Sequence, residues 1–439
     1  MNFLKTSAGS HPEKCCPERG DKVANNERRY VIIGASAAGM AAAEAIRQSD
    51  STGFITVLSE EPVQPYFRPM IPFLISGKKS VADMTLVGQG PYSGTGIDVR
   101  LNSKAEAIDT KNQTVTVQGG DLVLYDRLLI ATGSRPYIPP EIEGTEAAGV
   151  FALRTLTDAL AAADCAAQAD HVVMLGGGLL NLKAAFALLE RGLDVTLVVY
   201  SPEVLSQLME PDDAVLIRDA LNKAGLKIMT DCSATHILSQ AGGVNGVLLN
   251  SGQEMFCQMV CIGKGVFPNV NFLEQSDVQV DQGVVVDRFT ACNAANVFAA
   301  GDVAVTFDPI TSDRIVTGLW TNAVEMGRCA GYNMAGRTTE YTGTFGILNA
   351  TQVADEPFVS MGIVHTSGTD YETHVFSTRN TYRKLVFSED GERLVGAVFV
   401  GDISHAGLYR YVMREKMDVA KIKPFIIKHT LHYGHLLLP

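Results

Sequence analysis

The sequence lacks the features that several classes of protein require. Its 36 lysines and arginines are outnumbered by 48 aspartates and glutamates, and the net charge of −12 argues against a protein that binds nucleic acid. No apolar run is long enough to span a membrane. The polar first 28 residues contain no apolar core of a signal peptide, and we expect them to form a flexible extension. These absences predict a cytoplasmic protein with neither a nucleic-acid partner nor a membrane span.

The eight cysteines form no Cys-x-x-Cys pair, and their spacing does not indicate a disulfide framework. Cys257 and Cys261 fall in an expected buried strand, whereas Cys15 and Cys16 are adjacent in the N-terminal extension. The simplest interpretation is a set of reduced thiols. A redox or metal-binding role for Cys15 and Cys16, with a partner, is the alternative.

A chain of 439 residues is long enough for two or three domains, and its first strong motif follows the N-terminal extension. An apolar run over residues 30–33 stops at Gly34, a helix pattern begins near Ala37, and a second strand is expected over 53–61. This order of strand, turn, helix and strand is typical of a dinucleotide-binding unit.

The small residues of the turn each have a physical reason to be there. Gly34 permits the sharp turn, Ser36 lets the backbone approach a pyrophosphate, and Gly39 lets the helix pack closely on the strand. The helix N-terminus would supply free N–H groups to the phosphates. An acid is also needed about 20 residues further on, where it accepts ribose hydroxyls. Glu60 is the best-placed candidate for this acid and Glu61 is the next.

A second unit of the same kind spans residues 171–200. Its turn, Gly176-Gly177-Gly178, opens a helix pattern, but Asn181 takes the place of the third glycine. Val199 stands where an acid selective for NAD would be expected, and no lysine or arginine follows it to bind the 2′-phosphate of NADP. The sequence therefore predicts a second dinucleotide-binding fold, while a working nicotinamide site and its preference stay open.

The remainder of the chain completes an α/β pattern. A buried strand ends at Ala131-Thr132-Gly133, and "NVFAAGD" (296–302) is a strand that closes on Asp302. From about residue 337, alternating strands and one expected helix over 403–416 indicate a separate domain. The predicted fold is α/β, with two Rossmann-like dinucleotide-binding domains, the first of them discontinuous, and a C-terminal α+β domain.

Six motifs in order resemble those of the pyridine nucleotide-disulfide oxidoreductase family, in particular its thiol-free members such as the rubredoxin, ferredoxin and nitrite reductases. The motifs are "GASAAG" (34–39), "EEPVQPYFRP" (60–69), "LLIATGSRP" (128–136), "IGKGVFPN" (262–269), "NVFAAGD" and "GLWTNAVEMGRCAGYNMAG" (318–336). The resemblance implies an FAD-binding domain over 29–150 and 281–336, after the extension at 1–28. It also implies an NAD(P)-binding-like domain over 151–280 and an interface or dimerisation domain over 337–439.

The resemblance further implies which residues contact each cofactor. Glu60 would bind the adenosine ribose of FAD, Asp302 the ribitol chain, and Ala323, after Trp320, would lie at the pyrimidine edge of the flavin. The residues implied to contact FAD are Gly34, Ser36, Ala37, Ala38, Gly39, Glu60, Glu61, Arg68, Pro69, Thr132, Gly133, Gly301, Asp302 and Ala323. Those implied to contact NAD are Gly176, Gly178, Leu179, Leu180 and Gly263. The alternatives are a surface charge for Arg68 and a core residue for Trp320.

The chain also departs from the family pattern. The segment 68–78, which matches the one that carries a reactive cysteine in disulfide reductases, contains none. Phe73 occupies the position of a lysine that ferredoxin-reductase-like members place near flavin N5, and Lys183 replaces a glutamate close to the nicotinamide. We therefore expect no thiol relay beside the flavin.

The function predicted from these motifs is that of an FAD-dependent oxidoreductase without a redox-active cysteine. A hydride would pass between NADH, in preference to NADPH, and flavin N5, and electrons would then pass to a one-electron protein acceptor such as ferredoxin or rubredoxin. Two alternatives stay open: an FAD-binding relay subunit of a larger redox complex with a degenerate nicotinamide site, or a small-molecule reductase. We expect a homodimer or a complex subunit. His429, His432 and His435 are expected to form no metal site.

Overall fold

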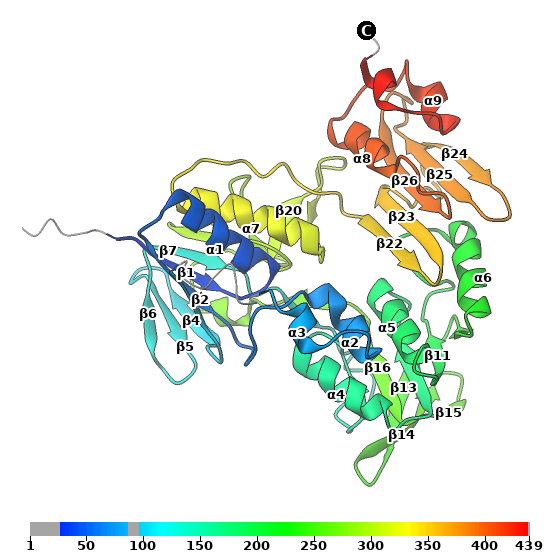
Figure 1. The fold of residues 1–439 in the computed structure, drawn as a ribbon, viewed down its shortest axis with the longest axis horizontal. Coiled ribbons are helices and arrows are strands. Elements are labelled where there is room, and N and C mark those ends of the chain that lie inside the picture. The colour runs from blue at the N-terminus through cyan, green and yellow to red at the C-terminus, as the bar shows by residue number, and fades with distance from the viewer. Residues whose placement is uncertain (1–26, 87–95, 438–439) are drawn as a thin grey trace, which may run out of the picture.

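The computed structural model describes residues 27–86 and 96–437. The predicted N-terminal extension, apart from its last two residues, lies outside the described residues, as do Cys15 and Cys16. Figure 1 shows three units: one built from the blue, cyan and yellow parts of the chain, one from the green part, and one from the orange and red part. The predicted fold class is confirmed, including the discontinuity of the first unit.

The first unit is organised around a five-stranded parallel sheet with the order β19-β7-β1-β2-β3. An antiparallel sheet, β4-β5-β6, accompanies it. The strands are β1 (Arg29–Ile33), β2 (Phe54–Leu58), β3 (Ile97–Arg100), β4 (Ala105–Asp109), β5 (Thr114–Val117), β6 (Leu122–Leu124), β7 (Arg127–Ile130) and β19 (Val297–Ala299). The helices are α1 (Ala37–Ser49) and α7 (Trp320–Met334), which lie side by side in Figure 1. A small further sheet consists of β18 (Val284–Val285), β20 (Ala304–Phe307) and β21 (Arg314–Ile315).

Helices α1 and α7 approach each other closely because both carry small residues at their contact. A Cβ atom added at Gly327 would lie 2.1 Å from the carbonyl oxygen of Ala38, and one added at Gly331 would lie 2.4 Å from that of Ala42. The alanine-rich sequence of α1 therefore serves close helix packing as well as helix propensity. This contact fixes the start of α1 at the carboxyl ends of the parallel strands.

The second unit repeats the parallel architecture with the order β12-β11-β10-β16-β9. Its elements are β9 (Val150–Phe151), α4 (Leu156–Ala166), β10 (His171–Leu175), α5 (Leu179–Leu189), β11 (Asp194–Val198), α6 (Val215–Lys223), β12 (Lys227–Met229) and β16 (Met259–Ile262), with an antiparallel sheet of β13 (Ala234–Gln240), β14 (Gly243–Leu249) and β15 (Glu254–Phe256). The ribbon of β8 (Ser134–Pro136) and β17 (Val266–Pro268) joins it to the first unit, and the short helices α2 (Ile71–Ile75) and α3 (Val81–Met84) lie between the two units in Figure 1.

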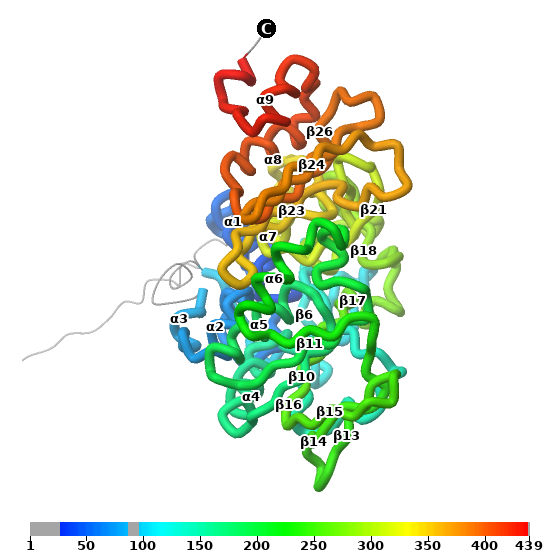
Figure 2. Tube along the Cα trace, turned by 90° about the vertical axis from the view of Figure 1, so that its right-hand side faces the viewer, coloured from blue at the N-terminus to red at the C-terminus, as the bar shows by residue number. Residues whose placement is uncertain are grey.

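The third unit is an antiparallel sheet with helices at its far end. The strand order is β22-β23-β26-β25-β24. Its elements are β22 (Leu348–Val353), β23 (Glu356–Gly362), β24 (Glu372–Ser377), β25 (Tyr382–Phe387), β26 (Leu394–Val400), α8 (Ala406–Arg414) and α9 (Lys423–Ile427). The helix expected over 403–416 is thus α8, shorter at both ends. Figure 1 and Figure 2 both place this sheet next to α6 of the second unit.

A buried charge cluster joins the third unit to the second. The Lys384 side chain on β25 is only 4% exposed and forms ion pairs with Glu210 and Asp213, which precede α6. Tyr382 donates a hydrogen bond to Asp213, and the backbone N–H groups of Thr366 and Ser367 donate to Glu210 at 2.9 Å. Burial alone would raise the pKa of Glu210, but the hydrogen bonds from Lys384, Ser367 and Thr366 outweigh it and lower the pKa to about 2.

The close packing of α1 on α7 predicts the effect of a single methyl group. We expect Gly327→Ala to destabilise the protein by about 1–3 kcal/mol, because the added Cβ meets backbone that cannot rotate away. The free energy of unfolding in urea measures this. Gly407→Ala on α8 is the matched control, since no heavy atom lies within 4 Å of its added Cβ. Equal stability of the two variants would contradict the packing argument.

The lowered pKa of Glu210 predicts an acid-sensitive attachment of the third unit. A carboxyl group with a folded-state pKa below its ordinary value of 4.5 stabilises the fold above that value. This contribution is lost as the pH falls from about 4.5 towards about 2. Urea unfolding of the wild type should therefore show a falling stability over this range, and Glu210→Gln should flatten the profile there. An unchanged profile in Glu210→Gln would assign the acid sensitivity to other carboxyl groups.

Candidate functional site

A cavity of about 790 Å³ lies at the carboxyl ends of the first parallel sheet and reaches the start of α4 and α5. Its volume is within the usual range of ligand pockets. It brings together residues from distant parts of the chain, including most of those that the sequence singles out. Of the residues expected at FAD, those that line it are Gly34, Ser36, Ala37, Ala38, Glu60, Glu61, Arg68, Pro69, Thr132, Gly133, Gly301, Asp302 and Ala323.

Gly39, which is absent from this lining, has a packing role instead. A Cβ atom at Gly39 would lie 1.8 Å from the carbonyl oxygen of Gly34. At Gly34, where φ is +114°, an added Cβ would lie 2.1 Å from the carbonyl oxygen of Ala131. The loop is therefore pressed against β7, and only glycine fits at these two positions. Ser36 is the N-cap of α1 but its side chain makes no capping hydrogen bond, so the first amides of α1 face the cavity uncapped.

The two acids that follow β2 have different surroundings. Glu60 is 64% exposed and forms a 2.7 Å ion pair with Lys104, which also lines the cavity. Glu61 is 21% exposed and forms a 2.6 Å ion pair with Arg68. It also accepts a 3.0 Å hydrogen bond from the hydroxyl group of Tyr66. Both acids reach the cavity, but only Glu60 has a carboxylate that solvent reaches freely.

A second ion pair inside the cavity joins Asp302 to Arg154. Arg154 Nη2 lies 2.9 Å from Asp302 Oδ2, and the same nitrogen donates to Ser134 Oγ at 2.9 Å. Ser134 Oγ in turn donates to Asp302 at 3.1 Å. The predictions from sequence missed Arg154 and Ser134. One signal was available, because Arg154 directly precedes the capping box of Thr155 and Asp158 and so had to lie at the start of a helix.

Aromatic and small residues form the end of the cavity beside α7. Trp320 lines it and packs edge-on against Phe67, with ring centroids 4.7 Å apart. Gly301 lies next to Ala323, since a Cβ atom added at Gly301 would lie 3.4 Å from the Ala323 Cβ. Trp320 also packs against the hydrophobic core of the first unit, so the two interpretations of this residue from sequence stay open.

No cysteine is among the residues that line this cavity. The six cysteines in the described part of the chain are free thiols. Burial raises the pKa of each, to about 12 for Cys257 and Cys292, so these thiols stay protonated at neutral pH.

The second loop has the same backbone form as the first. A Cβ at Gly176, where φ is +111°, would lie 2.3 Å from the carbonyl oxygen of Gly263, and Gly178 is the N-cap of α5. Asn181 is buried, and its side-chain amide donates at 2.9 Å to the carbonyl oxygens of both Leu175 and Gly176. The larger residue therefore fastens the loop to the end of β10 instead of disrupting it.

Most of the other residues expected to contact the nicotinamide nucleotide do not line the large cavity. Leu180 lines the large cavity, while Gly176, Gly178, Leu179 and Gly263 do not. Lys183 lies on α5 and is half-buried, and this burial lowers its pKa. Tyr200, just after β11, is 75% exposed.

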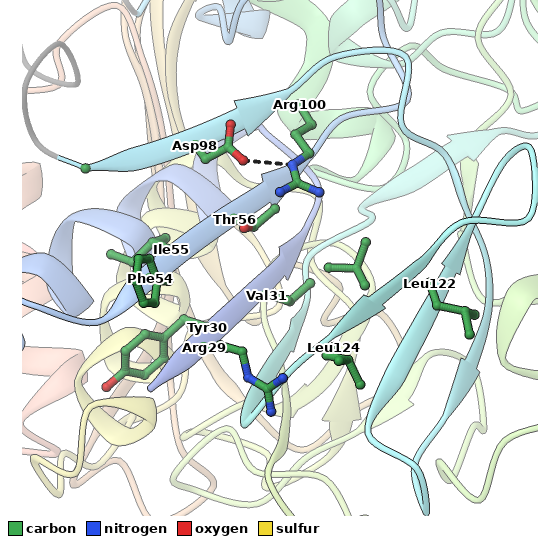
Figure 3. Close-up of a pocket in the computed structure, with 12 residues that line it drawn as sticks. Arg29, Tyr30, Val31, Phe54, Ile55, Thr56, Asp98, Arg100, Leu122 and Leu124 are labelled. Carbon is green, nitrogen blue, oxygen red and sulfur yellow. Dashed lines mark hydrogen bonds and ion pairs between the residues drawn. The ribbon is translucent and has the colours of Figure 1, made fainter. Parts of the chain in front are cut away.

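A smaller groove, of about 430 Å³, lies between the strands β1 to β3 and β6 (Figure 3). Its floor carries Val31 and Ile55. Its charged side chains are paired, Arg100 with Asp98 at 2.7 Å and Arg29 with Asp126 at 2.7 Å. These pairs occupy the groups that could otherwise bind a charged ligand.

No group of three or more potential metal ligands occurs among residues 27–86 and 96–437. His429 forms a 2.9 Å hydrogen bond with Tyr409, and the rings of His432 and His435 lie 3.7 Å apart. Within the same residues, no helix is long and apolar enough to cross a bilayer.

Comparison with known proteins gives two family matches and close relatives. Residues 28–327 match the pyridine nucleotide-disulphide oxidoreductase family, and residues 348–417 match the rubredoxin NAD+ reductase C-terminal domain. The NADH-dependent phenylglyoxylate dehydrogenase subunit epsilon of Aromatoleum evansii is 29% identical, over 93% of this chain and 97% of its own. The rubredoxin-NAD(+) reductase of Pseudomonas putida is 29% identical, over 70% of this chain and 80% of its own.

Among solved structures, the NAD-dependent persulfide reductase from A. fulgidus superposes with a TM-score of 0.85. It is 26% identical and covers 90% of this chain and 78% of its own. The family resemblance inferred from the six motifs is therefore confirmed, together with the cofactors that the family uses, FAD and a pyridine nucleotide. The chain belongs to the pyridine nucleotide-disulphide oxidoreductase family and is an FAD-dependent oxidoreductase.

Proposed function

We propose that the protein transfers electrons between NADH and an iron–sulfur or rubredoxin-type protein, through FAD held in the large cavity. The observation that carries this proposal is the cavity itself, which combines a dinucleotide loop with two internal ion pairs and is lined by no cysteine. Bound FAD accepts a hydride from a nicotinamide and releases electrons singly. With no thiol in the cavity lining, the electrons have to leave to an external acceptor.

The residues that line the cavity have separate roles in this proposal. The loop from Gly34 to Ala38 and the uncapped start of α1 bind the pyrophosphate. Glu60 accepts the ribose hydroxyls, and Asp302, oriented by Arg154, accepts a hydroxyl of the ribitol chain. The remaining small or polar contacts are Pro69, Thr132, Gly133, Gly301 and Ala323.

For the nicotinamide, the second loop supports a working site. Gly176 and Gly178 leave the first amides of α5 uncapped, and Asn181 preserves the loop. Leu179, Leu180 and Gly263 complete the site in this proposal. NADH is favoured over NADPH because the segment that follows β11, residues 199–210, contains no lysine or arginine to bind a 2′-phosphate.

The acceptor is argued from the relatives. The rubredoxin-NAD(+) reductase of Pseudomonas putida is similar over 70% of this chain, and residues 348–417 match the rubredoxin NAD+ reductase C-terminal domain. Both findings support a small one-electron protein as partner. The full-length similarity to a subunit of phenylglyoxylate dehydrogenase supports the second candidate, an FAD-binding subunit of a larger redox complex. In either case we propose that the protein is cytoplasmic. We also propose an FAD-binding domain over 29–150 and 281–336, an NAD(P)-binding domain over 151–280, and an interface domain over 337–439.

Anaerobic titration tests the proposed function directly. We expect the purified protein to show flavin absorbance, and NADH to bleach it at lower concentration than NADPH. Reduced protein should then reduce an added rubredoxin or ferredoxin. Absence of bleaching by either nucleotide would contradict the reductase and leave the relay subunit as the better account. Rapid turnover with small quinones but none with the proteins would favour a small-molecule reductase.

The close approach at Gly34 predicts which single change removes the cofactor. Gly34→Ala should abolish FAD binding, because its Cβ would meet the Ala131 carbonyl and its φ of +114° is strained for alanine. The ratio of absorbance at 450 to 280 nm, roughly zero in this variant, measures FAD content. Gly243→Ala is the control, since its nearest neighbours are 4.0 Å away. Normal FAD content in Gly34→Ala would show that the pyrophosphate binds elsewhere.

A further inference from the structure

We infer that Glu61 is a positioning residue, which fixes the Arg68 guanidinium in the FAD cavity and connects it to the start of α4. This role differs from the ribose contact that the family resemblance implies for an acid at this point. The inference rests on the proposed function in one respect, namely that the cavity holds FAD.

Three groups of the protein itself hold the Arg68 guanidinium. Its Nη2 lies 2.6 Å from Glu61 Oε1, and its Nη1 donates to the carbonyl oxygen of Arg154. Its guanidinium carbon lies 4.9 Å from the centre of the Tyr66 ring, within the range of a cation–π contact. Both ends and one face of the guanidinium are therefore held, although an arginine side chain in solution samples many rotamers.

Glu61 organises this arrangement through both of its oxygens. Oε1 binds Arg68, while Oε2 accepts from the Tyr66 hydroxyl at 3.0 Å and faces the backbone N–H of Leu156 at 3.5 Å. Burial raises the pKa of Tyr66, so its hydroxyl remains a donor at neutral pH. The carboxylate thus sets the position of the cation and of the ring beneath it.

The same contacts extend across the cavity. Arg154, whose carbonyl accepts from Arg68, binds Asp302 with its side chain at 2.9 Å. A continuous series of polar contacts therefore runs from Glu61 through Arg68 and Arg154 to Asp302. Loss of Glu61 would free Arg68 at one end and loosen the Arg154 segment at the other. Neighbouring Glu60 instead pairs with Lys104, and within the described residues its side chain forms no hydrogen bond or ion pair with these four residues.

What Glu61 provides is preorganisation. Two of the five N–H groups of Arg68 are used by Glu61 and Arg154, and the Arg68 side chain, which is 20% exposed, lines the cavity. An anionic or carbonyl group of the cofactor then meets a cation whose rotamer entropy has already been lost on folding. This makes binding tighter without any direct contact between Glu61 and the cofactor.

Double-variant cycles on the FAD-loaded protein test this role. The rate of FAD release on dilution, followed as the rise in flavin fluorescence, is measured for Glu61→Gln, Arg68→Gln and the double variant. We expect each single variant to release FAD about 10-fold faster or more, because a charge-assisted contact is lost. In the Arg68→Gln background, Glu61→Gln should add less than about 2-fold, since the ion pair through which Glu61 acts on FAD in this inference is already gone.

Glu60→Gln in the same background is the matched control, because Glu60 acts on FAD independently in our proposal and its effect should add in full. Glu61→Asp, which keeps the carboxylate, should restore part of the slow release at an unchanged thermal midpoint. A merely structural role would lower the midpoint in both Glu61 variants and show no such rescue. Additive effects of Glu61→Gln and Arg68→Gln, or unchanged release in Glu61→Gln, would overturn the inference. A wild type that carries no FAD would instead contradict the proposed function.

Discussion

The absence of a Cβ atom at the first glycine of each loop is the constraint on which the two cofactor sites depend. At Gly34 and at Gly176, an added Cβ would lie 2.1 Å and 2.3 Å from the carbonyl oxygen of a residue that follows a neighbouring strand. The chain can therefore turn directly from strand to helix against the end of the sheet. This turn aims the amides of α1 and α5 at the space beyond the strands, where a phosphate can be bound. The close glycine-mediated contact between α1 and α7 then holds the first of these helices in place.

The electrostatics of the large cavity follow from pairing within it. Arg68 is paired with Glu61, and Arg154 with Asp302, and the four side chains are all less than a quarter exposed. Such partly buried pairs are screened less by solvent than surface pairs, so their geometry is well defined. The cavity therefore carries fixed dipoles and no isolated charge among these four groups. That arrangement suits a cofactor whose own charge changes during the reaction, because the surroundings do not need to reorganise.

Much of this could be predicted from the sequence, because the motifs depend on local geometry. The strand, turn and helix around Gly34 need small residues at fixed spacing, and the predicted fold class and family are confirmed. The Arg154–Asp302 pair could not be predicted, because its members are 148 residues apart in the chain. The sequence ranks Glu60 before Glu61 as the acid that binds ribose, but it could not predict that Glu60 pairs with Lys104 and Glu61 with Arg68, because the fold sets these partners. The individual cofactor contacts stay predictions.

Asn181 shows how a departure from a motif can be misjudged when only the sequence is known. An asparagine at the third glycine position suggests a helix pushed away from its strand and a nucleotide site that has degenerated. In the structure the Asn181 amide instead donates two hydrogen bonds, to the carbonyl oxygens of Leu175 and Gly176 at the end of β10. These bonds take the place of close helix packing. The amide group is buried but satisfied, so it costs little. The loop keeps the positive φ of Gly176 and the uncapped start of α5. The departure at Asn181 therefore does not count against nicotinamide binding, and the case for a pure relay subunit has to depend on Lys183 and Val199.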